Sequence, residues 1–174
     1  RKLLRDNKNK LNTGFVGTPL LCNVLTEHGM TDLAYRLLLN EEYPGWLHEV
    51  KLGATTVWER WNSLDENGRI SSTGMNSLNH YSYGAVLEWI FRHVAGIDVT
   101  EQGPGGKMMR ISPKVDHKLG SASAVYDSAS GCYRCGWQIE NGDQITVTVT
   151  VPFGAKAQVI LPYAPDSVYH DTDN

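Results

Sequence analysis

The densest group of chemically capable side chains is a short aromatic stretch around one carboxylate. Residues 55–62 read Thr-Thr-Val-Trp-Glu-Arg-Trp-Asn, so Glu59 stands between Trp58 and Trp61 with Arg60 beside it. Indole faces pack against the apolar face of a pyranose, and a carboxylate either binds hydroxyl groups or activates water as a general base. The stretch therefore indicates a sugar site. The alternative is that both indoles belong to the core and that Glu59 pairs with Arg60 at the surface.

A second polar group follows at residues 76–84, which read Asn-Ser-Leu-Asn-His-Tyr-Ser-Tyr-Gly. Asn and Ser are common helix caps, but capping accounts for only one or two of these side chains. His80 has two interpretations. It is either a structural histidine whose ring nitrogens are satisfied within the fold, or a hydrogen-bond partner for a substrate hydroxyl.

The cysteines and histidines do not form a pattern typical of a metal site. Cys132 and Cys135 have the spacing of half a zinc site, but no second pair of Cys or His stands at a matching spacing. In a strand these two thiols point to opposite faces, which also argues against a disulfide. No His-Glu-x-x-His motif occurs, and no glycine-rich phosphate loop follows a predicted strand. We therefore expect neither a metal nor a cofactor.

Composition narrows the classes of partner. The chain has 174 residues, 41% hydrophobic and 20% charged, and its formal net charge of −3 offers no positive surface to nucleic acid or anionic lipid. No apolar run approaches the roughly 20 residues of a transmembrane helix. We therefore expect neither nucleic acid nor a membrane as partner. Residues 1–10 are basic and polar and lack an initiator Met, which predicts a piece of a longer polypeptide.

The first half of the chain has helical spacing. Thr18-Pro19 begins one helix that ends at Gly29, and Thr31 begins a second helix that runs to about residue 38. The short link between them predicts an antiparallel helical hairpin. A third helix is predicted over 75–94, where apolar residues share one stripe.

A long connection, residues 40–74, separates the second and third helices. Structureless segments of this length in compact domains are usually functional or disordered. The connection contains Tyr43, Trp46, Trp58 and Trp61, and only burial or binding holds side chains that large in place. Its composition therefore argues against disorder.

After a glycine-rich loop at 99–106 the pattern changes to short strands. Apolar residues alternate with threonines over 145–151, which is typical of a strand with one buried face, and Asn141-Gly142 is a hairpin signal. Strands are predicted at 107–111, 121–126, 132–140, 144–151 and 157–161. The sequence thus predicts an α + β chain, with a helical part at 1–97 and an antiparallel β-sandwich at 98–174.

Five segments together resemble the bacterial α-L-rhamnosidases of glycoside hydrolase family 78. These are Gly14–Pro19, Thr31–Tyr35, Tyr43–Trp46, Gly53–Trp61 and Gly74–Gly84, in this order and at matching spacing. The similarity extends from about Asn12 to Pro162. It implies a large enzyme whose catalytic domain is an (α/α)6 barrel followed by a C-terminal β-sandwich. Residues 1–97 would supply the closing helices of the barrel, and residues 98–174 would form the sandwich.

The resemblance also implies a function and roles for particular residues. Members of the family release terminal α-L-rhamnose from glycosides with inversion, which requires two carboxyl groups. Glu59 matches the proposed general base of the family, and His80 matches a histidine that contacts the sugar. Trp46, Trp58 and Trp61 are candidates for the pocket wall.

One element of the family pattern is missing from this sequence. The general acid of the family lies in an upstream stretch that has no counterpart here, so the isolated chain is expected to be inactive. Its exposed helix faces are expected to contact the rest of the parent chain or a second copy.

Two other functions compete with the rhamnosidase interpretation. One is a non-catalytic carbohydrate-binding or structural module, in which the aromatic stretch only grips sugar. The other is an (α/α)6 glycosidase with a different sugar specificity. Replacement of Glu59 distinguishes the binding module from an enzyme, because only an enzyme that uses Glu59 as its base would lose turnover. A panel of aryl glycosides distinguishes a glycosidase of other specificity from a rhamnosidase.

Overall fold

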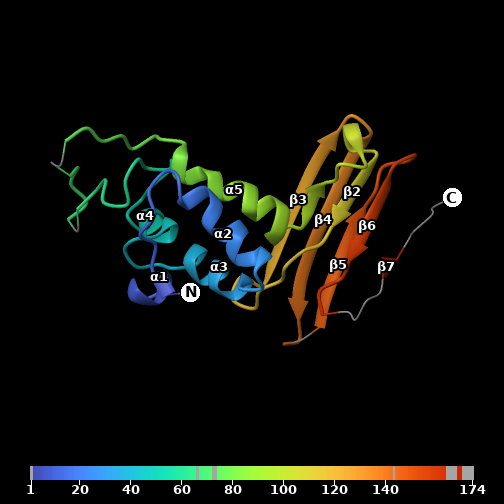
Figure 1. Cartoon of the computed structure of the whole chain (residues 1–174), viewed down its shortest axis with the longest axis horizontal. Helices are drawn as coiled ribbons and strands as arrows, with labels where there is room; N and C mark the ends of the chain where they lie inside the picture. Colours follow the sequence, from blue (N-terminus) through green and yellow to red (C-terminus); the bar gives the residue numbers. More distant parts are fainter. Residues whose placement is uncertain (1, 66, 72–73, 143, 164–167, 170–174) are drawn as a thin grey trace. The chain divides into compact units, whose positions relative to one another are not determined.

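The computed structural model describes the whole chain except residues 1, 66, 72–73, 143, 164–167 and 170–174 (Figure 1). The chain folds into two compact units, residues 1–87 and residues 88–174. Helices dominate the first unit and β-strands dominate the second. The α + β fold class is therefore confirmed, and the two units are described separately below.

The first unit begins with α1 (Lys2–Asp6), α2 (Thr18–Glu27) and α3 (Thr31–Leu38). Helices α2 and α3 are the predicted hairpin, which is confirmed with boundaries within two residues. Gly29 lies between them with φ +69°, a left-handed conformation that favours glycine. The two helices pack against each other, and each contributes a fully buried leucine, Leu25 and Leu37.

The predicted third helix is wrong over residues 75–81. Helical structure begins only at η1 (Ser82–Ala85) and continues through α5 (Val86–Trp89) and the π-helix η2 (Ile90–Val94). The backbone of Ser77 and His80 is bonded to residues 57–59 instead of to a helical turn, and Ser77 Oγ also accepts a hydrogen bond from the Asn79 backbone N–H at 3.1 Å. Such Ser-based turns satisfy the backbone outside a helix.

The long connection contains one helix that the sequence did not predict, α4 (Trp46–Lys51). It follows Gly45, and a side chain at that position would collide with the backbone and side chain of Asn40. Beyond α4, an isolated antiparallel bridge joins Leu64 to Ile70. The connection is therefore ordered structure in its described residues.

The second unit contains two sheets. The four-stranded sheet has the order β1 (Ile97–Val99), β2 (Met108–Ile111), β6 (Lys156–Ile160), β7 (Val168–Tyr169), and the three-stranded sheet is β3 (Ser121–Ser128), β4 (Gly131–Glu140), β5 (Gln144–Thr150). All five predicted strands are present. The pairing of β2 with β6 is parallel, a detail that the sequence did not predict, and every other strand pair is antiparallel. A short 3-10 helix, η3 (Pro104–Gly106), precedes β2.

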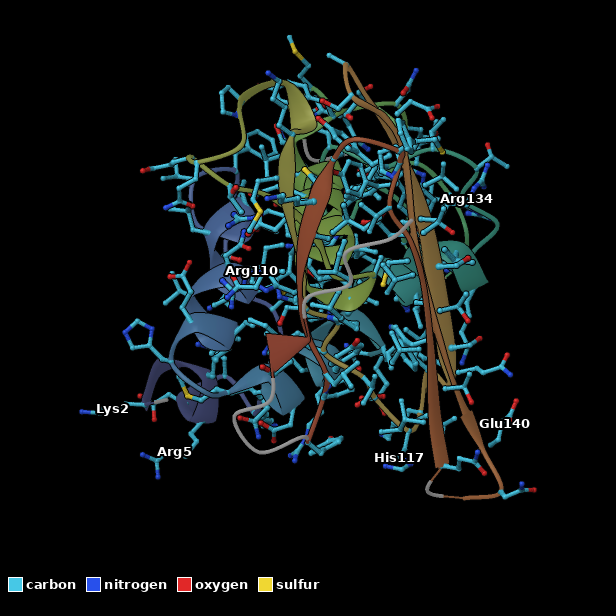
Figure 2. All side chains as sticks on the ribbon, turned by 90° about the vertical axis from the view of Figure 1, so that its right-hand side faces the viewer. Lys2, Arg5, Arg110, His117, Arg134 and Glu140 are labelled. Atoms are coloured by element: carbon cyan, nitrogen blue, oxygen red, sulfur yellow. The ribbon has the colours of Figure 1, made fainter. Side chains whose placement is uncertain are left out.

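The two sheets share one core, as a sandwich does. Along β4 the buried side chains Tyr133, Cys135 and Trp137 alternate with exposed ones. Figure 2 shows two of the exposed ones, Arg134 and Glu140, on the outer face of the three-stranded sheet. Tyr133 and Cys135 pack in one core cluster with Ile97, Met109 and Ile111 of the four-stranded sheet.

The sequence argued against a disulfide, a metal site and a membrane-spanning helix. Cys22, Cys132 and Cys135 are free thiols. Within the described residues, no three or more His, Cys, Asp or Glu side chains are grouped so that they could hold a metal ion. In the same part of the chain, no helix has both the length and the apolar character needed to cross a membrane.

Candidate functional site

Two segments that are distant in the sequence lie side by side in the first unit. The Glu59 backbone N–H donates to the Ser77 carbonyl at 2.9 Å, and the His80 backbone N–H donates to the Val57 carbonyl at 2.8 Å. The Thr56 hydroxyl adds a hydrogen bond to the Leu78 carbonyl. This pairing brings the segment of Glu59 next to the segment of His80. The two polar groups singled out by the sequence therefore lie next to each other in the fold and form one candidate site.

The far end of the Glu59 segment is also anchored to the second segment. The Arg60 backbone N–H donates to Ser63 Oγ at 3.1 Å, and Ser63 Oγ donates to Asn76 Oδ1 at 2.7 Å. In return, Asn76 Nδ2 donates to the Ser63 carbonyl at 2.9 Å. Glu59 itself is half-buried. Its backbone is thus fixed on both sides, while the residue as a whole remains partly exposed.

His80 is oriented by its own neighbours. The Ser82 backbone N–H donates to His80 Nδ1 at 3.3 Å, which favours the neutral tautomer with the proton on Nε2. The imidazole stacks with Phe15 at a centroid distance of 4.9 Å and with Tyr81 at 5.3 Å, both at 14°. The His80 ring is therefore held by two stacking contacts and by the hydrogen bond at Nδ1.

The structure places the three candidate tryptophans in the core of this unit. Trp58 is 3% exposed, and Trp46 and Trp61 are 9% exposed each. Trp61 stacks on Tyr83 at 4.0 Å and meets Trp46 edge-on at 5.3 Å. The Trp46 indole N–H donates to the Tyr83 carbonyl at 3.0 Å, and the Trp61 indole N–H donates to the Thr13 carbonyl at 3.2 Å. These indoles form the packed support behind the Glu59 segment.

The structure adds one carboxyl group that the sequence reasoning missed. Glu49 lies on α4 and is only 3% exposed. Its Oε2 accepts a long hydrogen bond of 3.5 Å from the Trp58 backbone N–H, and its Oε1 has no hydrogen-bond partner among the described residues. Burial raises the pKa of Glu49 to about 7, although the Trp58 N–H opposes this rise. No sequence pattern pointed to Glu49, because residues 40–74 were predicted only as a long connection without a helix.

Glu49 makes stability depend on pH. Its folded pKa of about 7 lies above the ordinary 4.5, so its stabilising contribution is complete below pH 4.5 and is lost as the pH rises through 7. We expect Glu49→Gln to gain stability over wild type between those values, by about 1 kcal/mol at pH 8 after allowance for solvent screening. Thermal unfolding of both chains from pH 4.5 to 8 measures this gain. Glu27→Gln, at an exposed position on α2, is the control and should show none.

Comparison with known proteins identifies the family. Residues 1–94 match the bacterial alpha-L-rhamnosidase 6 hairpin glycosidase domain, and residues 96–173 match the bacterial alpha-L-rhamnosidase C-terminal domain. The two matches define the class of protein: a helical glycosidase domain followed by a C-terminal domain, in the same order as the helical and β-rich parts of this chain. The chain belongs to the bacterial alpha-L-rhamnosidase family, which confirms the resemblance of the five sequence segments.

Individual relatives agree with this assignment. An alpha-L-rhamnosidase of Alteromonas sp. is 44% identical over 160 residues, which are 92% of this chain and 17% of the relative. One from Streptomyces avermitilis is 40% identical over 161 residues, which are 92% of this chain and 15% of the relative. The chain therefore spans less than one fifth of the length of either relative.

Solved structures are similar over nearly the whole chain. The Streptomyces avermitilis alpha-L-rhamnosidase complexed with L-rhamnose is 34% identical with a TM-score of 0.85, and the match covers 97% of this chain and 18% of that one. The alpha-L-rhamnosidase of Aspergillus terreus is 32% identical with a TM-score of 0.90, and its match covers 97% of this chain and 19% of that one.

Proposed function

We propose that this chain acts as one portion of a longer glycoside hydrolase that removes terminal α-L-rhamnose from rhamnose-containing glycosides. The observation that carries the proposal is the backbone pairing between the Glu59 segment and the His80 segment. The relatives named alpha-L-rhamnosidase support it, as does the similar structure that was solved with L-rhamnose.

The proposed mechanism inverts the anomeric carbon. Inverting glycosidases use two carboxyl groups about 6.5–9.5 Å apart, one to protonate the leaving oxygen and one to activate water on the opposite face. Glu59 is the proposed general base, and it takes a proton from the attacking water. The general acid is proposed to come from another portion of the longer polypeptide, because no segment of this sequence matches the acidic stretch of the family.

The remaining site residues have binding and supporting roles in this proposal. His80 donates through Nε2 to a hydroxyl of the rhamnose. Trp46, Trp58 and Trp61 were candidates for the pocket wall, and because all three are buried they are proposed to support the Glu59 segment from within the core instead of contacting the sugar. The proposal also divides the chain into a helical part at 1–97 and a sandwich at 98–174. The two family matches meet near that boundary, at residues 94 and 96.

The apolar face of α2 is proposed to contact other portions of the longer polypeptide. Leu20 is 59% exposed and Val24, one turn later, is 46% exposed. Such a stripe on a soluble helix normally marks a contact surface. In the isolated chain the same face is free to meet a second copy, which would be detected by sedimentation.

A panel of aryl glycosides tests the proposed function. The longer polypeptide that contains this chain should hydrolyse the α-L-rhamnoside and leave the fucoside, glucoside and mannoside largely intact. The purified 174-residue chain should release no rhamnose, because it lacks the general acid. Nuclear magnetic resonance of the first product formed should show the inverted anomer. Preference for another sugar would assign a different (α/α)6 glycosidase, and binding without turnover would indicate a carbohydrate-binding module.

A further inference from the structure

Glu49 is a buried carboxyl group whose presence the packing does not explain. It is 3% exposed, lies on the same helix as buried Trp46, and has one oxygen without a hydrogen-bond partner among the described residues. A carboxyl group in such surroundings costs stability in its charged form. Methionine has a similar length and would fill the same space without a buried charge, and the loss of the long 3.5 Å hydrogen bond from the Trp58 N–H would offset only part of that gain. A requirement other than stability is therefore the better explanation of a carboxyl group at this position.

The position of Glu49 relative to the Glu59 segment supplies that requirement. The Val57 carbonyl and the Trp58 N–H belong to one planar trans peptide group, so they point in opposite directions. The Val57 carbonyl and the Glu59 N–H are both bonded to residues 77–80. The intervening Trp58 N–H is bonded instead to Glu49 Oε2. Glu49 thus serves as the hydrogen-bond partner on the second side of the segment, directly before the residue proposed as the general base.

We propose that Glu49 is a positioning residue for Glu59: by accepting the Trp58 N–H it holds the backbone from which the Glu59 carboxylate reaches the attacking water. This inference rests on the proposed function. It makes a distinctive claim, because loss of the acceptor lowers turnover without lowering stability. A merely structural role would move both together.

Three substitutions in the longer enzyme test this inference. Glu49→Gln keeps an acceptor for the Trp58 N–H and should keep kcat within about 3-fold of wild type. Glu49→Met removes the acceptor and should lower kcat by about 10- to 100-fold with KM within about 3-fold, since small misplacements of a reacting group cost this much. The Tm of the Met variant at pH 8 should equal or exceed that of wild type. Glu101→Met, at an exposed position in the turn after β1, is the matched control and should change neither kcat nor Tm.

The outcomes separate this inference from the proposed function. A Glu49→Met enzyme with wild-type kcat overturns the positioning role. If both Glu49 variants lose kcat and Tm together, the positioning role is also overturned, because this result indicates that Glu49 is only structural. If those results occur while Glu59→Gln is inactive, the proposed function survives. A wild-type enzyme without rhamnosidase activity overturns the proposed function and this inference with it.

Discussion

Replacement of Glu59 by Gln in the longer enzyme is expected to lower kcat on an aryl α-L-rhamnoside by about 10²- to 10⁴-fold. The amide is nearly isosteric with the carboxylate, so the hydrogen bond from the Glu59 backbone to Ser77 is kept. It has no basic oxygen and cannot accept the proton of the attacking water. KM should change little, because substrate binding depends on other groups.

The control for Glu59→Gln is the same substitution at Glu101, which lies exposed in the turn after β1 and should leave kcat and KM unchanged. Retention of most of the activity by the Glu59 variant would show that Glu59 is structural. If the longer enzyme retains its activity and loses affinity for rhamnosides only when Trp58 or Trp61 is replaced, this chain is instead a carbohydrate-binding module within it. Steady-state kinetics over a range of substrate concentrations separates these results from a change in affinity.

The helical hairpin and the five strands could be predicted because each is specified locally. Over residues 18–38 the apolar side chains recur with the period of a helix on either side of Gly29. The φ of Gly29 is +69°, which favours glycine. Over β5 the threonines and the apolar residues alternate with a period of two, and the structure exposes and buries them in the same order. Patterns of this kind depend on one buried face and require no knowledge of distant residues.

The arrangement around the candidate site could not be predicted in the same way. Residues 75–81 have apolar side chains at helical spacing, yet their backbone bonds to Val57 and Glu59 instead of forming a helix. That competition depends on a contact across the chain. The motifs predicted that Glu59 and His80 matter, but only the pairing of their segments shows that they lie together.

Glu49 illustrates a second limit of sequence reasoning. A glutamate in a segment for which the sequence predicts no helix or strand is typical of a solvated surface. Its burial follows from the packing of α4 against Trp58 and Tyr83, and neither contact is encoded near residue 49. The same packing accounts for the burial of Trp46, Trp58 and Trp61, for which the composition allowed either a place in the core or a place in a sugar pocket. Long-range contacts decide both questions.

The largest loss of stability is expected from Gly96→Ala in the second unit. Gly96 is buried between η2 and β1 and has φ +86°, where an L side chain is strained. A Cβ at this position would overlap the backbone of Pro113. Movement of Pro113 would disturb the neighbouring hydrogen bond of 2.8 Å from the Ser112 N–H to the Gly96 carbonyl. We expect a loss of about 3 kcal/mol or more, in the range of severe overpacking plus backbone strain.

Gly142→Ala separates the two causes of the loss expected at Gly96, the backbone strain at positive φ and the collision of the new Cβ with Pro113. Gly142 has φ +90° in the turn between β4 and β5, and a Cβ there would have nothing within 4 Å. This variant therefore carries only the conformational penalty, about 1 kcal/mol. Urea unfolding of wild type and both variants, followed by circular dichroism, gives the two differences in the free energy of unfolding. Equal losses would mean that Pro113 moves aside at no cost and that the contact beside β1 is not tightly packed.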